Sequence, residues 1–280
     1  MNSSRTPEDL TILPRDLHFD VSTARSGHWL DGDPVGTAVM NTLSLTFPDG
    51  ERLFMDAVRA YKDQLSGRLE QDAKDFIAQE AIHSREHHLL NRMIDRSKYP
   101  VERVEAEIRD KIAFSRSGGP MRMLMATICL EHFTAMLADM FAVHNDMFSK
   151  TEPSIKDLWR WHAMEETEHK AVAYDVFLIA AKDWSGFQRW FRRSLAMLLI
   201  SYNFTRNVAE YASWMLEADG YSPKAAKKAV KEFLWKQPGF FARGWHIWVT
   251  WFKPGFHPWD HDNRPLMAEW QSEFDLVAAE

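Results

Sequence analysis

The segment WRWHAMEETEH, residues 159–169, contains two histidines and a glutamate at helical spacing. His162, Glu166 and His169 lie four and three residues apart. On an α-helix these positions fall at roughly 0°, 40° and −20° around the axis, so the three side chains point in the same direction. A glutamate is almost never buried unless it is paired or binds a metal. The segment therefore predicts a helix that directs one carboxylate and two imidazoles toward a common centre.

A second Glu-x-x-His pair, Glu80 and His83, occurs earlier in the chain. Two further glutamates, Glu51 and Glu131, each precede one of the two pairs, and Glu131 follows an apolar run. The chain thus has the order Glu, Glu-x-x-His, Glu, Glu-x-x-His. Two such pairs alone are weak evidence, but their order, helical context and apolar surroundings together predict a buried metal centre.

This order resembles that of the ferritin-like di-iron carboxylate proteins, in which two helices of a four-helix bundle give one glutamate each and two give Glu-x-x-His. The resemblance implies an all-α fold, a ferritin-like four-helix bundle with additional C-terminal helices. It also implies a six-residue metal site. Its members would be Glu51, Glu80, His83, Glu131, Glu166 and His169.

We expect three parts in the chain: an N-terminal arm packed on the bundle (1–45), a di-metal four-helix bundle (46–184) and a helical, aromatic-rich C-terminal extension of the same domain (185–280). The first bundle helix is expected to begin near Thr46 or Asp49, with Pro48 in its first turn and Glu51 near one end. Further helices are expected at about 69–97, 101–115, 121–148, 154–182, 187–216 and 222–235.

Composition limits the class of protein. A net charge of −6 argues against nucleic-acid binding, which normally needs a basic face. The single cysteine, Cys129, excludes an internal disulfide and fits a reducing compartment. The N-terminus is polar and lacks the apolar segment of a signal peptide. We therefore expect a soluble, cytoplasmic protein. Its 12 tryptophans and 14 methionines suit a helical core or an apolar ligand cavity.

The C-terminal segment 238–256 places tryptophan and phenylalanine beside arginine and lysine. Three interpretations remain open. The segment packs on the bundle and caps one end of it, or it forms a homodimer interface, or it makes a peripheral contact with lipid, since aromatic residues next to basic ones suit a membrane surface.

The extra histidine in His162-x-x-x-Glu166-x-x-His169 resembles the arylamine N-oxygenases, whose fourth ligand helix has the same pattern. There the added imidazole is a seventh protein ligand, so the resemblance implies His162 as a metal ligand here. Hydrogen bonding to a group on the metal, or packing against Trp159 or Trp161, are the alternatives for His162.

Neighbouring charged residues have less certain roles. Glu165 either orients a metal-binding histidine or is an ordinary surface acid. His87 either supports the site from behind or is an alternative seventh ligand. Glu86 and Glu168 fall on the far sides of their helices, where we expect them to be solvated.

Two further segments, HWLDGDP (28–34) and FPDGE (47–51), resemble a bacterial family catalogued as predicted metal-dependent hydrolases. Carboxylate and imidazole donors suit two iron ions, with manganese possible. We expect a di-iron oxygenase or oxidase that uses dioxygen to oxidise a small, largely apolar organic substrate. A dinuclear hydrolase, in which two metals lower the pKa of a water, is the alternative. Non-catalytic iron binding or storage is a second alternative.

Overall fold

The computed structural model describes residues 5–279 apart from 144, 237 and 240. In these residues the secondary structure is helical and includes no β-strand, which confirms the predicted all-α class. The α-helices are α1 (Pro34–Arg59), α2 (Arg68–Asn91), α3 (Val101–Ser117), α4 (Pro120–Val143), α5 (Pro153–His169), α6 (Val172–Ala180), α7 (Gly186–Ala218), α8 (Pro223–Trp235), α9 (Trp245–Thr250) and α10 (Arg264–Ala278).

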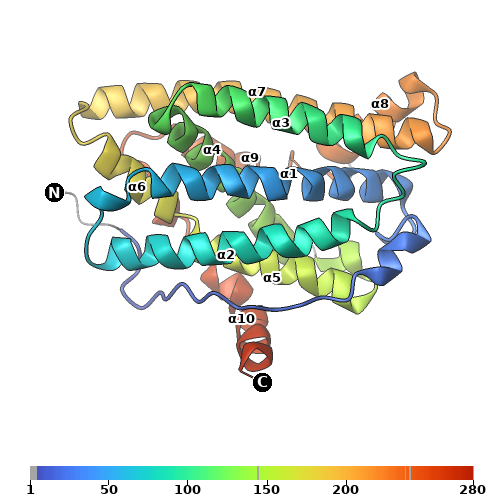
Figure 1. Ribbon diagram of the computed structural model, residues 1–280, viewed down its shortest axis with the longest axis horizontal. Helices are drawn as coiled ribbons and strands as arrows, with labels where there is room; N and C mark the ends of the chain where they lie inside the picture. Colours follow the sequence, from blue (N-terminus) through green and yellow to red (C-terminus); the bar gives the residue numbers. More distant parts are fainter. Residues whose placement is uncertain (1–4, 144, 237, 240, 280) are drawn as a thin grey trace.

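Helices α1, α2, α4 and α5 enclose a common interior. Helix α1 contacts α2 and α4, and α5 contacts the same two helices, so the four close into a bundle. Helices α3 and α7 run along the outside of α1 and α4, and α10 projects from the opposite side (Figure 1). The charged helix α3 spans much of the length of the bundle (Figure 1).

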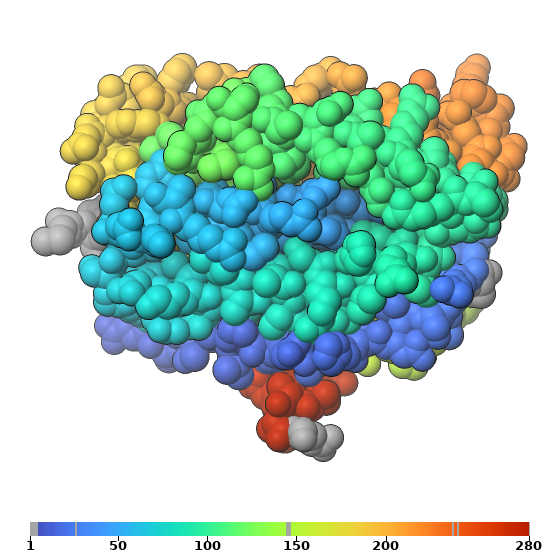
Figure 2. Space-filling model, viewed as in Figure 1, coloured from blue at the N-terminus to red at the C-terminus, as the bar shows by residue number. Residues whose placement is uncertain are grey.

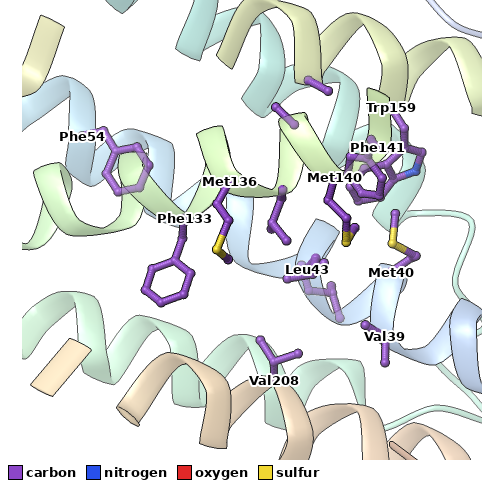
Figure 3. Packing of buried hydrophobic residues seen from close by; sticks show 14 of the residues in the cluster. Val39, Met40, Leu43, Phe54, Phe133, Met136, Met140, Phe141, Trp159 and Val208 are labelled. Atoms are coloured by element: carbon purple, nitrogen blue, oxygen red, sulfur yellow. The ribbon is translucent and has the colours of Figure 1, made fainter. Parts of the chain in front are cut away.

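Helix α4 is the central element of the core. Its side chains Phe133, Met136 and Met140 lie among residues of α1 and α7, including Leu43 and Val208 (Figure 3). It is also the one helix among the described residues that is long and apolar enough to cross a membrane. However, 72% of its apolar window is buried inside the protein. Such burial is typical of a core helix in a soluble protein.

The N-terminal arm, described from residue 5 to residue 33, lies along α2 and α5 on the side where α10 projects (Figure 2). Gln79 of α2 donates a hydrogen bond to the Leu13 carbonyl at 3.2 Å, and the Arg15 amide lies 3.3 Å from Glu165 of α5. The arm therefore covers the seam between the two helices that carry the Glu-x-x-His pairs.

Helix α1 begins at Pro34, well before the predicted start near Thr46, so the prediction was wrong. The carboxylate of Asp33 accepts hydrogen bonds from the amides of Val35 and Gly36, and Pro34 occupies the first turn. This is a strong helix start. Glu51 is consequently well inside the helix, two turns from its end.

Pro48 lies inside α1 and cannot donate to the carbonyl of Ser44, one turn earlier. The side-chain amide of Asn91, on α2, takes over this role and donates to the Ser44 carbonyl at 3.0 Å. The partner helix therefore supplies the hydrogen bond that the proline removes, which is why the helix continues through it.

The predicted helix 154–182 is divided in two. Helix α5 ends at His169 and α6 begins at Val172, so the break immediately follows the last residue of the motif. At the start of α5, Pro153 occupies the first turn and the carboxylate of Glu152 accepts hydrogen bonds from the amides of Ser154 and Ile155.

We expect Asn91→Ala to lower the free energy of unfolding by about 1–3 kcal/mol, because it leaves the buried Ser44 carbonyl without a donor. Denaturation with urea measures the change. Adding Pro48→Ala restores a backbone N–H to that carbonyl and should recover part of the loss. Equal stability of Asn91→Ala and the unmodified protein would contradict this account of α1.

Candidate metal centre

Seven residues predicted from the sequence meet in the interior of the bundle. Helices α1 and α4 contribute one glutamate each, α2 contributes a Glu-x-x-His pair, and α5 contributes the segment from His162 to His169. None of the seven is more than 3% exposed. They are Glu51, Glu80, His83, Glu131, His162, Glu166 and His169.

Their donor atoms form three overlapping groups, of which two share no residue and the third joins Glu80, His83 and Glu166. In the His162 group, donor atoms of Glu51, His83 and His162 all lie within 4.8 Å of one another. In the His169 group, donor atoms of Glu80, Glu131 and His169 meet the same limit. Two clusters side by side match the arrangement that a pair of cations requires.

Glu80 and Glu166 face both groups. Glu80 has one oxygen 3.4 Å from Nε2 of His169 and the other 3.9 Å from Nδ1 of His83. Glu166 has Oε2 3.4 Å from the same His169 nitrogen and Oε1 2.8 Å from Nε2 of His162. Each carboxylate thus presents one oxygen to each group, which is the geometry of a bridging ligand.

Most donor atoms that face this interior are buried without hydrogen-bond partners among the described residues, whereas Nε2 of His162 and Oε1 of Glu166 lie 2.8 Å apart. Polar atoms left in this way cost free energy, and a cation between them would remove that cost. The atoms are Oε1 of Glu51, both carboxylate oxygens of Glu80 and Glu131, Oε2 of Glu166, Nδ1 of His83 and Nε2 of His169. The residues present therefore fit a pair of divalent cations.

Burial and mutual repulsion set the protonation of these carboxyl groups. Burial, followed by repulsion from other glutamates, raises the pKa of Glu80 well above its ordinary value, and burial likewise raises the pKa of Glu131 to about 8. Burial also opposes ionisation of Glu166, but His169 and His162 outweigh it and hold the pKa of Glu166 well below its ordinary value. Against its own burial, His169 has a pKa raised to about 9, chiefly by Glu166.

Each histidine of the centre is held through the ring nitrogen that faces away from it. Nε2 of His83 lies 3.1 Å from Glu165, and Nδ1 of His169 lies 2.9 Å from the side-chain oxygen of Gln79. Such contacts orient the ring and leave the other nitrogen directed at a metal. Glu165 therefore lies where a carboxylate that orients a histidine would be.

Arg15, from the N-terminal arm, pairs with the acids behind the centre. Its guanidinium lies 3.1 Å from Glu165 and 2.8 Å from Glu168, and it is almost completely buried. Glu168 also accepts from Gln79 at 2.9 Å. The arginine thus links the supports of both His83 and His169. Sequence reasoning missed Arg15 and Gln79, since neither lies at a spacing that marks a ligand.

Glu168 and Glu86 are buried, so the prediction that they are solvated was wrong. The arm covers the faces of α2 and α5 that helical geometry alone leaves open. The carboxylate of Glu86 accepts hydrogen bonds from the Phe19 amide at 3.1 Å and from Arg85 at 2.7 Å.

A chain of hydrogen bonds determines which nitrogen of His162 carries its proton. The Asn91 amide donates to the Ser44 carbonyl, so its oxygen accepts from the Ser44 hydroxyl at 2.7 Å. That hydroxyl then accepts from Nδ1 of His87 at 2.9 Å. Nε2 of His87 in turn accepts from Nδ1 of His162 at 2.6 Å. Nδ1 of His162 therefore carries a proton, and Nε2, which lies 2.8 Å from Oε1 of Glu166, is the nitrogen directed into the centre. His87 lies behind His162 and is not among the grouped donor atoms.

A small pocket adjoins the centre at His162 and Glu166. Its volume of about 20 Å³ is enough for a water-sized molecule. Apart from Thr134, its other lining residues are apolar, and the Thr134 hydroxyl already donates to the Glu131 carbonyl. The apolar lining consists of Phe47, Leu137, Ala138, Phe141, Trp159 and Ala163.

The fold and the centre define an all-α protein with a buried cluster of histidines and glutamates that could hold metal. A family model described as "Predicted metal-dependent hydrolase" matches residues 13–262, and the chain belongs to that family. The match spans both Glu-x-x-His pairs and the covering arm. No curated protein and no solved structure matches the chain.

Metal binding should increase stability more at high pH than at neutral pH. Without a cation, the raised pKa values of Glu131 and His169, about 8 and 9, mean that both groups hold a proton at pH 7. Because a folded-state pKa above the unfolded value stabilises the folded chain only while the proton is bound, the cation-free protein loses this stability as the pH rises through those values. A cation must displace the same protons, so it binds better as they leave.

We therefore expect the difference in Tm between metal-loaded and metal-free protein to grow as the pH is raised from about 6.5 to about 8.5. Thermal unfolding followed by circular dichroism measures it. Groups outside the centre contribute equally to the Tm of both forms, so their contribution cancels in the difference. Lys170 is such a group, since burial lowers its pKa to about 7. A difference that shrinks over this range would contradict the ligand role of Glu131 and His169.

Proposed function

We propose that the protein is a dinuclear metal enzyme with Glu51, His83 and His162 on one cation, Glu131 and His169 on the other, and Glu80 and Glu166 between them. The observation that supports this most is the set of buried, unpartnered donor atoms facing one interior. Four carboxylates there need about four positive charges, which two divalent cations supply. The order of the ligands along the chain, which resembles that of the ferritin-like di-iron proteins, supports iron.

We infer that the reaction is oxidation of a small, largely apolar molecule by dioxygen. A pair of ferrous ions held by carboxylates and imidazoles would supply two of the four electrons that reduce dioxygen, and the substrate being oxidised would supply the other two. Phe47, Phe141 and Trp159 give the adjoining pocket an apolar lining. The substrates of hydrolases carry polar scissile groups, whereas the lining of this pocket is mainly apolar apart from the proposed ligands, Thr134 and the indole nitrogen of Trp159.

Hydrolysis is the second candidate, and the description of the family favours it over oxidation. It would use the same two cations to polarise the scissile group and to lower the pKa of a water. The chain's own residues would then act only as ligands, because the acids behind the centre are already paired with Arg15.

Two cations per chain, about 3.5–4 Å apart, are expected in iron-loaded protein. Elemental analysis and X-ray absorption measure the number and the separation. Glu131→Ala and His162→Ala, one from each group, should each weaken the binding of one cation at least tenfold. Glu107→Ala, at an exposed position of α3, is the matched control and should bind both normally. A single cation per chain, or full occupancy of Glu131→Ala, would contradict the proposed centre.

The two reactions are separated by their need for dioxygen. We expect the iron-loaded, reduced protein to consume dioxygen in a polarographic cell, and Glu131→Ala to lose most of that activity. Glu107→Ala should retain it. Metal-dependent cleavage of ester or phosphoester substrates under anaerobic conditions, with no consumption of dioxygen in air, would assign the protein to the hydrolases.

A further inference from the structure

Helix α7 presents an apolar face to solvent. Six large apolar or aromatic side chains on it are between 47% and 68% exposed. Their positions fall within an arc of roughly 120° on the helix, opposite the face that packs on α1 and α4. We call these residues the α7 stripe: Phe187, Phe191, Leu195, Leu198, Leu199 and Tyr202.

Helix α9 lies beside α7 and adds to this surface. The indole of Trp248 donates to the hydroxyl of Ser201 at 2.9 Å, and that of Trp190 donates to the Phe252 carbonyl at 2.8 Å. These contacts bury one side of α9. On its other side Trp245 and Val249, one turn apart, are exposed.

The segments that build this region contain no acidic residue. Residues 184–209 and 233–259 together hold seven of the 34 lysines and arginines and none of the 40 aspartates and glutamates. The remainder of the chain therefore has 27 basic residues against all 40 acidic ones. A protein with a net charge of −6 thus has a region of opposite sign in the same segments that expose the apolar side chains.

Basic residues lie beside the stripe. The exposed guanidinium of Arg192, next to Phe191, lies 4.3 Å from the ring centre of Trp184. Arg206 and Lys253 are also exposed. Large aromatic and aliphatic side chains flanked by arginine and lysine are typical of helices that lie in the plane of a membrane surface, where the apolar face enters the lipid and the cations meet anionic headgroups.

We propose that α7 and α9 form a docking surface for an anionic lipid bilayer. A second copy of the chain fits less well, since a symmetric dimer through this face would bring two regions of the same positive sign together. The proposal does not depend on which reaction the metal centre performs.

Co-sedimentation of the full-length protein with vesicles tests it. The protein should bind vesicles of phosphatidylcholine mixed with phosphatidylglycerol. It should bind vesicles of pure phosphatidylcholine much more weakly, and a high salt concentration should weaken its binding to the mixed vesicles. The double variant Leu198→Glu/Leu199→Glu should lose at least tenfold in binding, and Arg192→Gln about fivefold. Leu276→Glu, at a position of α10 that is 71% exposed, is the matched control and should bind normally.

Failure of the unmodified protein to bind mixed vesicles would overturn the proposal. So would a dimer in sedimentation velocity that Leu198→Glu/Leu199→Glu dissociates while vesicles are not bound, because the stripe would then join two copies. Because both leucines project into solvent, the double variant should melt at the same temperature as the unmodified protein. Arg192→Gln tests the same surface through its charge alone.

Discussion

The burial of four carboxylates in one helical interior is the constraint on which the rest of the structure depends. Glu51, Glu80, Glu131 and Glu166 are withdrawn from water, and an isolated buried carboxylate costs several kcal/mol or more. The three imidazoles of the centre could not balance four such groups even if all were protonated, and the residues that face the glutamates leave many of their oxygens unpartnered. A pair of cations would resolve this conflict, and binding metal and folding the interior would then be parts of one equilibrium. Each of the helices α1, α2, α4 and α5 contributes one of the four glutamates, so the centre joins all four helices of the bundle.

A second layer of charge surrounds the first and is balanced differently. Glu165 and Glu168 lie behind the centre and meet a single guanidinium, that of Arg15. The inner acids need a cation from solution, whereas the outer ones receive theirs from the chain's own N-terminal arm. This arrangement makes the arm part of the centre, since Arg15 is the cation for Glu165, which contacts His83, and for Glu168, which accepts a hydrogen bond from Gln79 beside His169. The arm also pairs through Arg15 with Asp275 of α10, so the two ends of the chain meet over the same face.

The sequence predicted the centre better than the helices that hold it. Helical periodicity places His162, Glu166 and His169 on one face without knowledge of any neighbour, and the order of the remaining ligands follows from a resemblance. Periodicity could not foresee contacts made across helices. Pro48 marked a helix start because its lost hydrogen bond is visible in the sequence, but the compensating amide of Asn91 is distant in the chain. Glu168 looked solvated for the same reason, since nothing local indicates that residues 13–19 cover it. The contact between the arm and Glu168 is set by tertiary packing, which local sequence patterns do not indicate.

The aromatic side chains of the C-terminal region fall into a buried set and an exposed set, and packing on the bundle explains only the buried set. Trp251, Phe256, Trp259 and Trp270 are buried, with Trp251 and Phe256 packed around His132 of α4, so packing on the bundle accounts for them. Trp245 and the α7 stripe gain nothing from that core, and exposing so much apolar surface in one place is unusual for a protein that stays free in solution. If packing on the bundle were the only constraint on this region, we would expect acidic residues on its surface, because the chain as a whole is acidic. The joint absence of carboxylates and presence of exposed aromatic residues therefore requires a cause outside the folded chain, and a surface that is both apolar and negatively charged satisfies both requirements at once.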